Sequence, residues 1–169
     1  MSKSLRAVAV FTALFFITAD AGWALEQDGK LDETFLLLMA ARNAAKTKQY
    51  EQSISRYYRL LERDPKFTDA RAELGWVLLV AGKPGEARKQ FEAVLESKPR
   101  DAEALKGLLE VLKKSGEKDD AFKVLERLVM VLPEDRDLRM QLAVELHNRG
   151  RYAEAEKHLN ILLPKDKNK

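Results

Sequence analysis

Residues 68–101, TDARAELGWVLLVAGKPGEARKQFEAVLESKPRD, contain two helix-like patterns separated by a glycine and closed by a proline. Apolar residues recur at intervals of three and four on both sides of Gly82, which is the spacing of one face of an α-helix. Glycine suits the residue just past a helix end because it adopts a left-handed backbone without steric cost, and Pro99 cannot continue a helix. The segment therefore predicts a helical hairpin followed by a stop.

The same pattern returns every 34 residues along the chain. Residues 34–67 hold a weaker copy, with Lys48 where the turn glycine belongs. A narrow apolar stripe cannot be buried within one hairpin, so neighbouring hairpins must stack to cover it. The pattern predicts an all-α solenoid of four hairpins and eight helices. The prolines and glycines that mark the period are Pro65, Pro99, Pro133, Gly82, Gly116 and Gly150.

These repeats resemble tandem tetratricopeptide repeats. Residues 68–101 match that family best, with a Leu-Gly pair in the first helix, a glycine at the turn and a small residue early in the second helix. The resemblance implies a right-handed α-solenoid in which the first helix of each repeat lines a concave groove for extended or helical peptides. The matching residues are Leu74, Gly75, Leu78, Gly82, Ala87, Phe91, Val94 and Pro99.

The resemblance extends over essentially all of the chain after its N-terminal segment. Four copies exceed the roughly three that are needed to bury a continuous core. The expected divisions are a lead-in at 25–33, a divergent first repeat at 34–67, repeats at 68–101 and 102–135, a truncated fourth repeat at 136–164 and a basic tail at 165–169.

Residues 1–24 have the layout of a secretory signal peptide. Two basic residues precede an apolar run at 7–17, and small residues follow it. The run is shorter than the roughly 20 residues of a membrane-spanning helix. We expect cleavage after Ala24 or Ala21 and a periplasmic or secreted protein. The alternative is an uncleaved anchor that tethers the domain to the inner membrane.

The composition offers little material for catalysis or for metal binding. The chain has no cysteine, only two histidines and a net charge of +3 with both signs interspersed. It lacks a His-Glu-x-x-His zinc pattern, a glycine-rich phosphate loop and a nucleophile elbow. We therefore expect no enzymatic activity, no cofactor, no metal, no small-molecule substrate and no nucleic-acid partner.

The resemblance implies that the binding residues lie on the first helix of each repeat. Trp76 is the main candidate, because it lies two places after the core position Leu74 and a tryptophan is well suited to anchor a ligand. The alternative is that Trp76 packs against a neighbouring helix. The predicted groove residues are Phe35, Leu38, Arg42, Lys46, Trp76, Leu79, Val80, Lys106, Glu110, Lys113, Met140, Val144 and His147.

The two ends of the array leave two interpretations open. Residues 35–41 are apolar around most of the helix, and no polar capping helix follows the last repeat. In the first interpretation, the chain forms a homo-oligomer through the apolar first helix or the uncapped last helix. The first helix could then also bind a partner protein. In the other interpretation residues 25–33 fold back over one end, and the lysines of the tail keep the other end soluble.

The function that fits these features is an exported, non-enzymatic adaptor that binds proteins during assembly of a cell-envelope complex. The alternative hypothesis is a periplasmic chaperone that holds exported clients. An adaptor binds one partner at fixed stoichiometry, whereas a chaperone binds many unfolded chains weakly.

Overall fold

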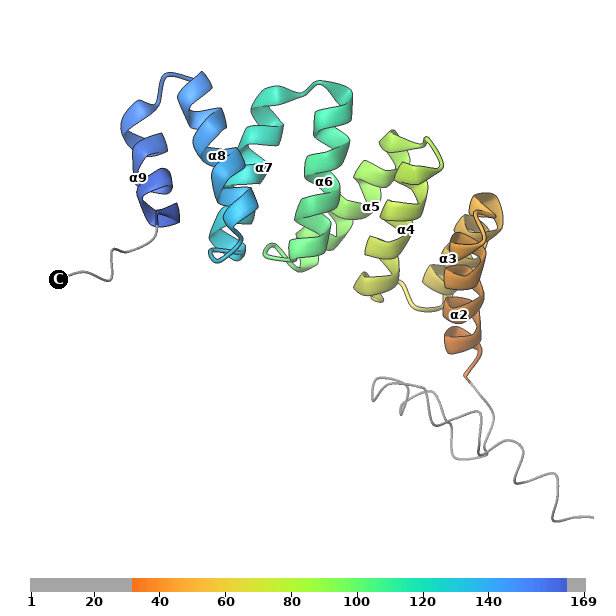
Figure 1. Cartoon of the computed structure of the whole chain (residues 1–169). Helices are drawn as coiled ribbons and strands as arrows, with labels where there is room; N and C mark the ends of the chain where they lie inside the picture. Colours follow the sequence, from red (N-terminus) through yellow and green to blue (C-terminus); the bar gives the residue numbers. More distant parts are fainter. Residues whose placement is uncertain (1–31, 164–169) are drawn as a thin grey trace, which may run out of the picture.

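A computed structural model describes residues 32–163, which form eight α-helices and contain no strand (Figure 1). The helices are joined by short turns, as their amphipathic spacing predicts. Their bounds are α2 Glu33–Lys46, α3 Tyr50–Arg63, α4 Thr68–Val80, α5 Pro84–Ser97, α6 Ala102–Ser115, α7 Lys118–Val131, α8 Arg136–Asn148 and α9 Tyr152–Leu162.

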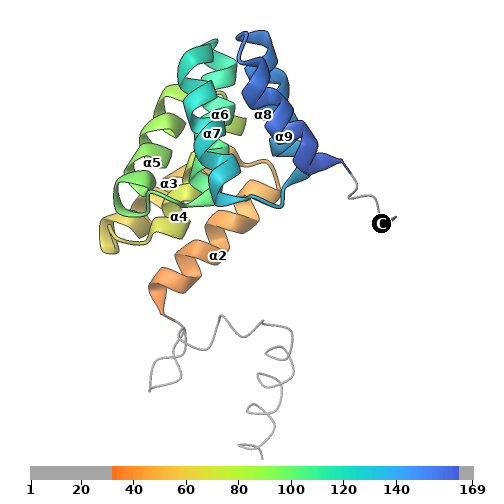
Figure 2. The same cartoon turned by 90° about the vertical axis from the view of Figure 1, so that its left-hand side faces the viewer.

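The helices pair into four hairpins that stack side by side along the array. Within each hairpin the two helices pack on each other, and the second helix of one hairpin packs on the first helix of the next. Figure 2 shows α8 and α9 side by side at one end of the stack. The expected all-α solenoid is confirmed. The expected signal peptide, lead-in and basic tail lie in segments 1–31 and 164–169, outside the described residues.

The tight turn inside each hairpin has a left-handed residue. Gly82, Gly116 and Gly150 have φ angles of 79°, 76° and 75°, so the three turn glycines occupy the conformation that favours them. Lys48 adopts φ 60° at the same place in the first hairpin. A left-handed backbone costs a non-glycine residue about 1–2 kcal/mol, which the packing of α2 against α3 must offset.

Caps and a proline set where several helices begin. The Asp101 carboxylate accepts a hydrogen bond from the backbone N–H of Ala104 at 2.9 Å and caps α6. The Asp135 carboxylate caps α8 in the same way. Pro84 occupies the first turn of α5, where its missing N–H has no helical partner to lose.

The core runs along the stack as one continuous cluster and thins at both ends. Leu159, which the sequence places on a core stripe, is 40% exposed because no described helix packs over it. At the same end Ile161 and Leu163 are exposed, and at the other end Leu36 and Met39 are exposed. Among residues 32–163, no helix is long and apolar enough to cross a bilayer.

Candidate protein-binding groove and cleft

Neighbouring hairpins meet at three junctions, which are α3 against α4 (first), α5 against α6 (second) and α7 against α8 (third). Residues 34 positions apart in the sequence take equivalent places at successive junctions. By this equivalence, each junction has one large side chain from a second helix, which lies between one position on the first helix before it and one on the first helix after it. The large side chains are Tyr57, Phe91 and Leu125, and the flanking pairs are Ala41 and Glu73, Gly75 and Gly107, and Leu109 and Gln141.

The second junction is closed by an aromatic ring that lies between two glycines. Phe91 is completely buried, and its ring meets the Trp76 ring in an edge-to-face arrangement with a centroid distance of 5.5 Å. A Cβ atom at Gly75 would lie 2.6 Å from the Phe91 ring, and one at Gly107 would lie 2.2 Å from it. Glycine at both positions therefore lets α4 and α6 come into direct contact around the ring.

The first junction is closed instead by the buried Tyr57, which is hydrogen-bonded to a partly exposed ion pair. The Tyr57 hydroxyl donates to Glu73 Oε2 at 2.6 Å, and Arg42 Nε donates to the same oxygen at 2.8 Å. Burial, followed by the hydrogen bond with the Glu73 carboxylate, raises the pKa of the Tyr57 phenol well above its usual value. The hydrogen bond with Glu73 also raises the pKa of the Arg42 guanidinium. Both groups therefore keep their protons and hold α2, α3 and α4 together.

The third junction is left partly open. Leu109 and Gln141 stand where the second junction has glycines, and the side chain between them is the smaller Leu125. The added side chains occupy the room that a close approach needs, and α6 and α8 do not come as near each other as α4 and α6 do. A cleft of about 910 Å³ lies between α6, α7 and α8.

The cleft is mainly apolar, with charged residues at its rim. Its apolar lining comes from α6, α7 and α8, and a hollow of about 260 Å³ adjoins it, sharing Leu109, Lys113 and Gln141. Two of the shared residues are hydrogen-bonded to each other, since Lys113 Nζ donates to Gln141 Oε1 at 3.1 Å. Six of the predicted groove residues line the two spaces, namely Trp76, Lys106, Glu110, Lys113, Met140 and Val144.

Trp76 combines both roles that the sequence left open. Its ring is half-buried against Phe91, and it also lines the smaller hollow. One face therefore packs in the second junction while part of the indole stays accessible. An aromatic side chain held in place by packing is a suitable anchor for a ligand, since little conformational entropy is lost on binding.

The other predicted groove residues do not join this site. Leu38 and Leu79 are packed within the core cluster at 4% and 6% exposure, so neighbouring side chains cover them and they leave the candidate site. Arg42 is engaged by Glu73. The remaining four are His147, whose ring packs on Tyr152, the half-buried Phe35, and the exposed Lys46 and Val80.

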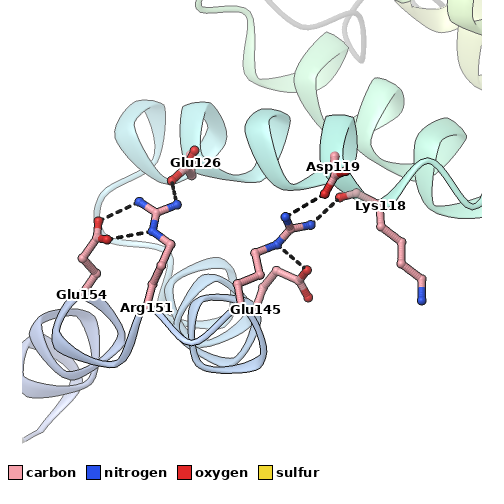
Figure 3. Close-up of polar contacts among 7 residues, drawn as sticks. Lys118, Asp119, Glu126, Glu145, Arg151 and Glu154 are labelled. Atoms are coloured by element: carbon pink, nitrogen blue, oxygen red, sulfur yellow. Dashed lines mark hydrogen bonds and ion pairs between the residues drawn. The ribbon is translucent and has the colours of Figure 1, made fainter.

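Two arginines hold the third junction together at one edge of the cleft. Arg149 binds Asp119 at 2.7 Å and Glu145 at 2.9 Å, and its guanidinium lies 4.3 Å from the centroid of the Phe122 ring. Arg151 reaches across to Glu126 on α7 while it also binds Glu154 (Figure 3). The third junction thus adds these charged contacts to the buried Leu125, whereas the second combines the buried Phe91 ring with the ion pair between Arg88 and Glu117.

Several lining residues were not predicted from the sequence. Leu112, Phe122 and Arg149 were missed, and for Phe122 the reason is that the groove was inferred from first helices alone whereas the cleft also includes α7. The available signal was the loss of glycine at positions 109 and 141 in the 34-residue register. Within residues 32–163, no group of three acidic, histidine or cysteine residues is arranged to hold a metal ion.

Comparison with known proteins agrees with this architecture. A tetratricopeptide-repeat family model matches residues 44–112. Among solved structures, MamA residues 41 to the end from Desulfovibrio magneticus RS-1 is 19% identical, with 81% of this chain and 78% of that chain covered and a TM-score of 0.65. A tetratricopeptide repeat protein from Parabacteroides merdae ATCC 43184 is 20% identical over 78% of this chain and 51% of that one, with a TM-score of 0.59.

A third structure is that of a peptide-binding protein. YrrB, described as a TPR protein with an unusual peptide-binding site, is 25% identical, with 75% of this chain and 65% of that chain covered and a TM-score of 0.63. No curated protein sequence matches the chain. Residues 44–112 therefore match the tetratricopeptide-repeat family, and the described helices share the all-α repeat fold of these solved structures.

Proposed function

We propose that the chain is a non-enzymatic adaptor that binds segments of partner proteins on the face formed by α4, α6 and α8. The observation that carries the proposal is the pair of adjoining spaces on this face, which bring six predicted groove residues together. Proteins of this family are typically interaction modules, and a structural neighbour is described as having a peptide-binding site.

The lining has the character of a protein-binding surface. Met140 and Val144 are 46% and 52% exposed, although apolar side chains of this size gain free energy when they are buried. Trp76 adds a fixed aromatic group, and lysines and a glutamate lie around it. An apolar centre with a polar rim is the usual composition of a protein interface.

Capture of partners from an envelope extract of the source organism tests the proposal. The bait is the purified chain, compared with Met140→Lys, which places a charge on the candidate surface. Met130→Lys is the matched control, since Met130 is 67% exposed on α7 and does not line either space. We expect one partner at fixed stoichiometry that Met140→Lys loses and Met130→Lys keeps.

Three results would contradict this assignment. Equal capture by both variants would place binding on another surface. Weak capture of many unfolded chains would favour the chaperone hypothesis. Absence of any partner, with both variants folded by circular dichroism, would remove the adaptor function.

We also propose that the adaptor acts outside the cytoplasm, on the basis of the signal-like pattern at residues 1–24. The test is to express the full chain, separate the periplasm from the membrane and measure the intact mass. Export is supported if the soluble periplasmic fraction contains a protein whose intact mass corresponds to a chain that begins after Ala21 or Ala24. An intact chain in the membrane fraction supports the anchored alternative, and an intact cytoplasmic chain rejects export.

A further inference from the structure

The cleft at the third junction is the part of the face formed by α4, α6 and α8 that extends inward between two hairpins as far as α7. Its floor is formed by Ala121, Phe122 and Leu125 of α7, all at most 8% exposed. Its walls are α6 and α8, which contribute Leu112 on one side and Val144 on the other. A segment that enters there would contact three helices at once.

We infer that this cleft receives an amphipathic helix of a partner protein, with an apolar stripe directed into the cleft and acidic residues on the flank beside the α6–α7 turn. The inference rests on the proposed function and assigns that function a site and a partner chemistry. An amphipathic helix that places its apolar face in a groove is a common mode of peptide recognition, with anchors at intervals of three and four residues.

The size and lining of the cleft support the apolar part of this inference. Its volume of about 910 Å³ falls near the upper end of the roughly 300–1,000 Å³ found for ligand pockets. This space holds several apolar side chains of one helix face. The second junction fills the equivalent place with the buried ring of Phe91. An inserted side chain would restore at the third junction the packing that Phe91 supplies at the second.

The charges around the cleft support the acidic part. Five charged residues line it, and Arg149 forms ion pairs with both of the acidic ones, Asp119 and Glu145. Lys113 donates to the neutral amide of Gln141, and Lys118 has no ion pair among the described residues. Figure 3 shows the Lys118 side chain directed away from the paired groups. Lys113 of α6 and Lys118 at the start of α7 therefore make the α6–α7 end of the cleft positive, and the net charge of its five charged residues is +1.

A second copy of this chain is the competing occupant, because Leu36 and Met39 are exposed on α2. The same face of α2 continues to the exposed Lys46, and its acidic residue Glu33 is already paired with Arg63. That helix would therefore bring a positive charge to a cleft edge that is already positive. The charge pattern favours an acidic partner helix over the chain's own α2.

The probe that tests the inference is a fluorescent helical peptide of about 14 residues, or about four turns, with leucines at intervals of three and four and glutamates on one flank. A second peptide carries lysines in place of the glutamates. Fluorescence anisotropy measures the binding of each to the full chain. The variants are Val144→Lys, which obstructs the cleft, and the pair Lys113→Glu with Lys118→Glu, which reverses its charge.

The matched controls introduce the same kinds of substitution at exposed residues outside the cleft. Met130→Lys repeats the introduction of a charge at an exposed apolar residue, and the pair Lys66→Glu with Lys89→Glu repeats the charge reversal at exposed lysines. We expect the acidic peptide to bind the wild type at least tenfold more tightly than the basic one. Val144→Lys and the charge reversal should each weaken binding about tenfold, and the controls should leave it within about twofold.

The outcomes separate this inference from the proposed function. Equal binding of the two peptides, or equal binding to Val144→Lys, overturns the inference. If no peptide binds while the envelope extract still yields a partner, the adaptor function stands and the cleft assignment fails. If light scattering shows self-association that Val144→Lys abolishes, the occupant is a second copy and the inference is wrong.

Discussion

The second and third junctions of this array follow one sequence pattern and reach different structures. At the second, the completely buried Phe91 ring lies between Gly75 and Gly107. At the third, Leu109 and Gln141 stand in place of the glycines, and a cleft lies between the equivalent helices α6, α7 and α8. The difference shows that two flanking positions, rather than the whole apolar pattern, determine how tightly neighbouring hairpins close.

This contrast has an energetic consequence. In a solenoid each hairpin contacts only its neighbours, so stability is approximately a sum of hairpin and junction contributions. A junction that encloses a large ring contributes more burial than one that borders a cleft. We therefore expect the second junction to hold the array together and the third to be the place where it adapts to a partner.

The largest expected effect comes from removing the ring. Phe91→Ala should lower the free energy of unfolding by about 3–5 kcal/mol, because it deletes a fully buried aromatic side chain and leaves a cavity. Leu125→Ala at the third junction should cost only about 2 kcal/mol, since its site borders existing space. Urea unfolding followed by circular dichroism measures both. Equal losses would mean that the two junctions are equally well packed.

The second effect comes from adding a methyl group beside the ring. Gly107→Ala should destabilise the protein by about 1–3 kcal/mol, because its Cβ would lie 2.2 Å from the Phe91 ring. The matched change Gln141→Ala at the third junction should alter stability by less than about 0.5 kcal/mol, since Gln141 is exposed.

A double variant tests the reason for the Gly107→Ala effect. Phe91→Leu shortens the side chain that the new methyl group meets and copies the residue of the third junction. If the collision is the cause, Gly107→Ala should cost less in the Phe91→Leu background than alone, which a double-mutant cycle measures. Simple additivity would show that the loss has another origin.

The sequence alone predicted the helices and the turns well because these depend on local rules. The 34-residue interval of Gly82, Gly116 and Gly150 required left-handed turns, and all three have them. Gly75, part of the Leu-Gly pair in the first helix, lies so close to the Phe91 ring that a Cβ atom there would be only 2.6 Å from it. Lys48 kept the same turn without glycine, because the register of the array fixes the backbone there.

The cleft was not predicted, because it arises from contacts between hairpins. Leu109 appears in the sequence as an ordinary apolar residue of α6, and only comparison with Gly75 in the 34-residue register shows that it is too large for a close approach. Leu38 and Leu79 were placed in the groove for a related reason. Periodicity does not reveal how far a neighbouring helix covers a residue, and the structure buries both.

The third effect concerns the first junction, where a hydrogen bond takes the place of the glycine pair. Tyr57→Phe removes the bond to Glu73 and should cost about 0.5–1.5 kcal/mol at neutral pH. Since the ring itself remains, the loss should be far smaller than that of Phe91→Ala. A loss as large as that of Phe91→Ala would mean that the Tyr57–Glu73–Arg42 group carries the junction.

The same tyrosine predicts a dependence on alkaline pH. Its pKa in the folded protein is raised above the ordinary value of 10.0, mainly by burial, so the unfolded chain loses this proton first. The contribution to stability is complete below about pH 10 and declines as the pH rises above it. Tyr57→Phe should therefore show a shallower decline than the wild type in urea unfolding between about pH 8 and 11. Identical slopes would exclude Tyr57 as the source.

The smallest effect is expected at the arginines of the third junction, and it tests whether this junction is the adaptable one. Arg149→Gln removes the ion pairs to Asp119 and Glu145 and the contact with Phe122, all of which lie near the surface. Exposed ion pairs contribute little and weaken with salt, so global stability should change slightly. Amide hydrogen exchange should nevertheless increase in α8 and α9 and stay unchanged in α4 and α5, because each hairpin is held only by its neighbours. High salt should reproduce this local pattern in the wild type. Uniform exchange across the array would show that the third junction opens no more readily than the second, and the comparison between them would lose its functional meaning.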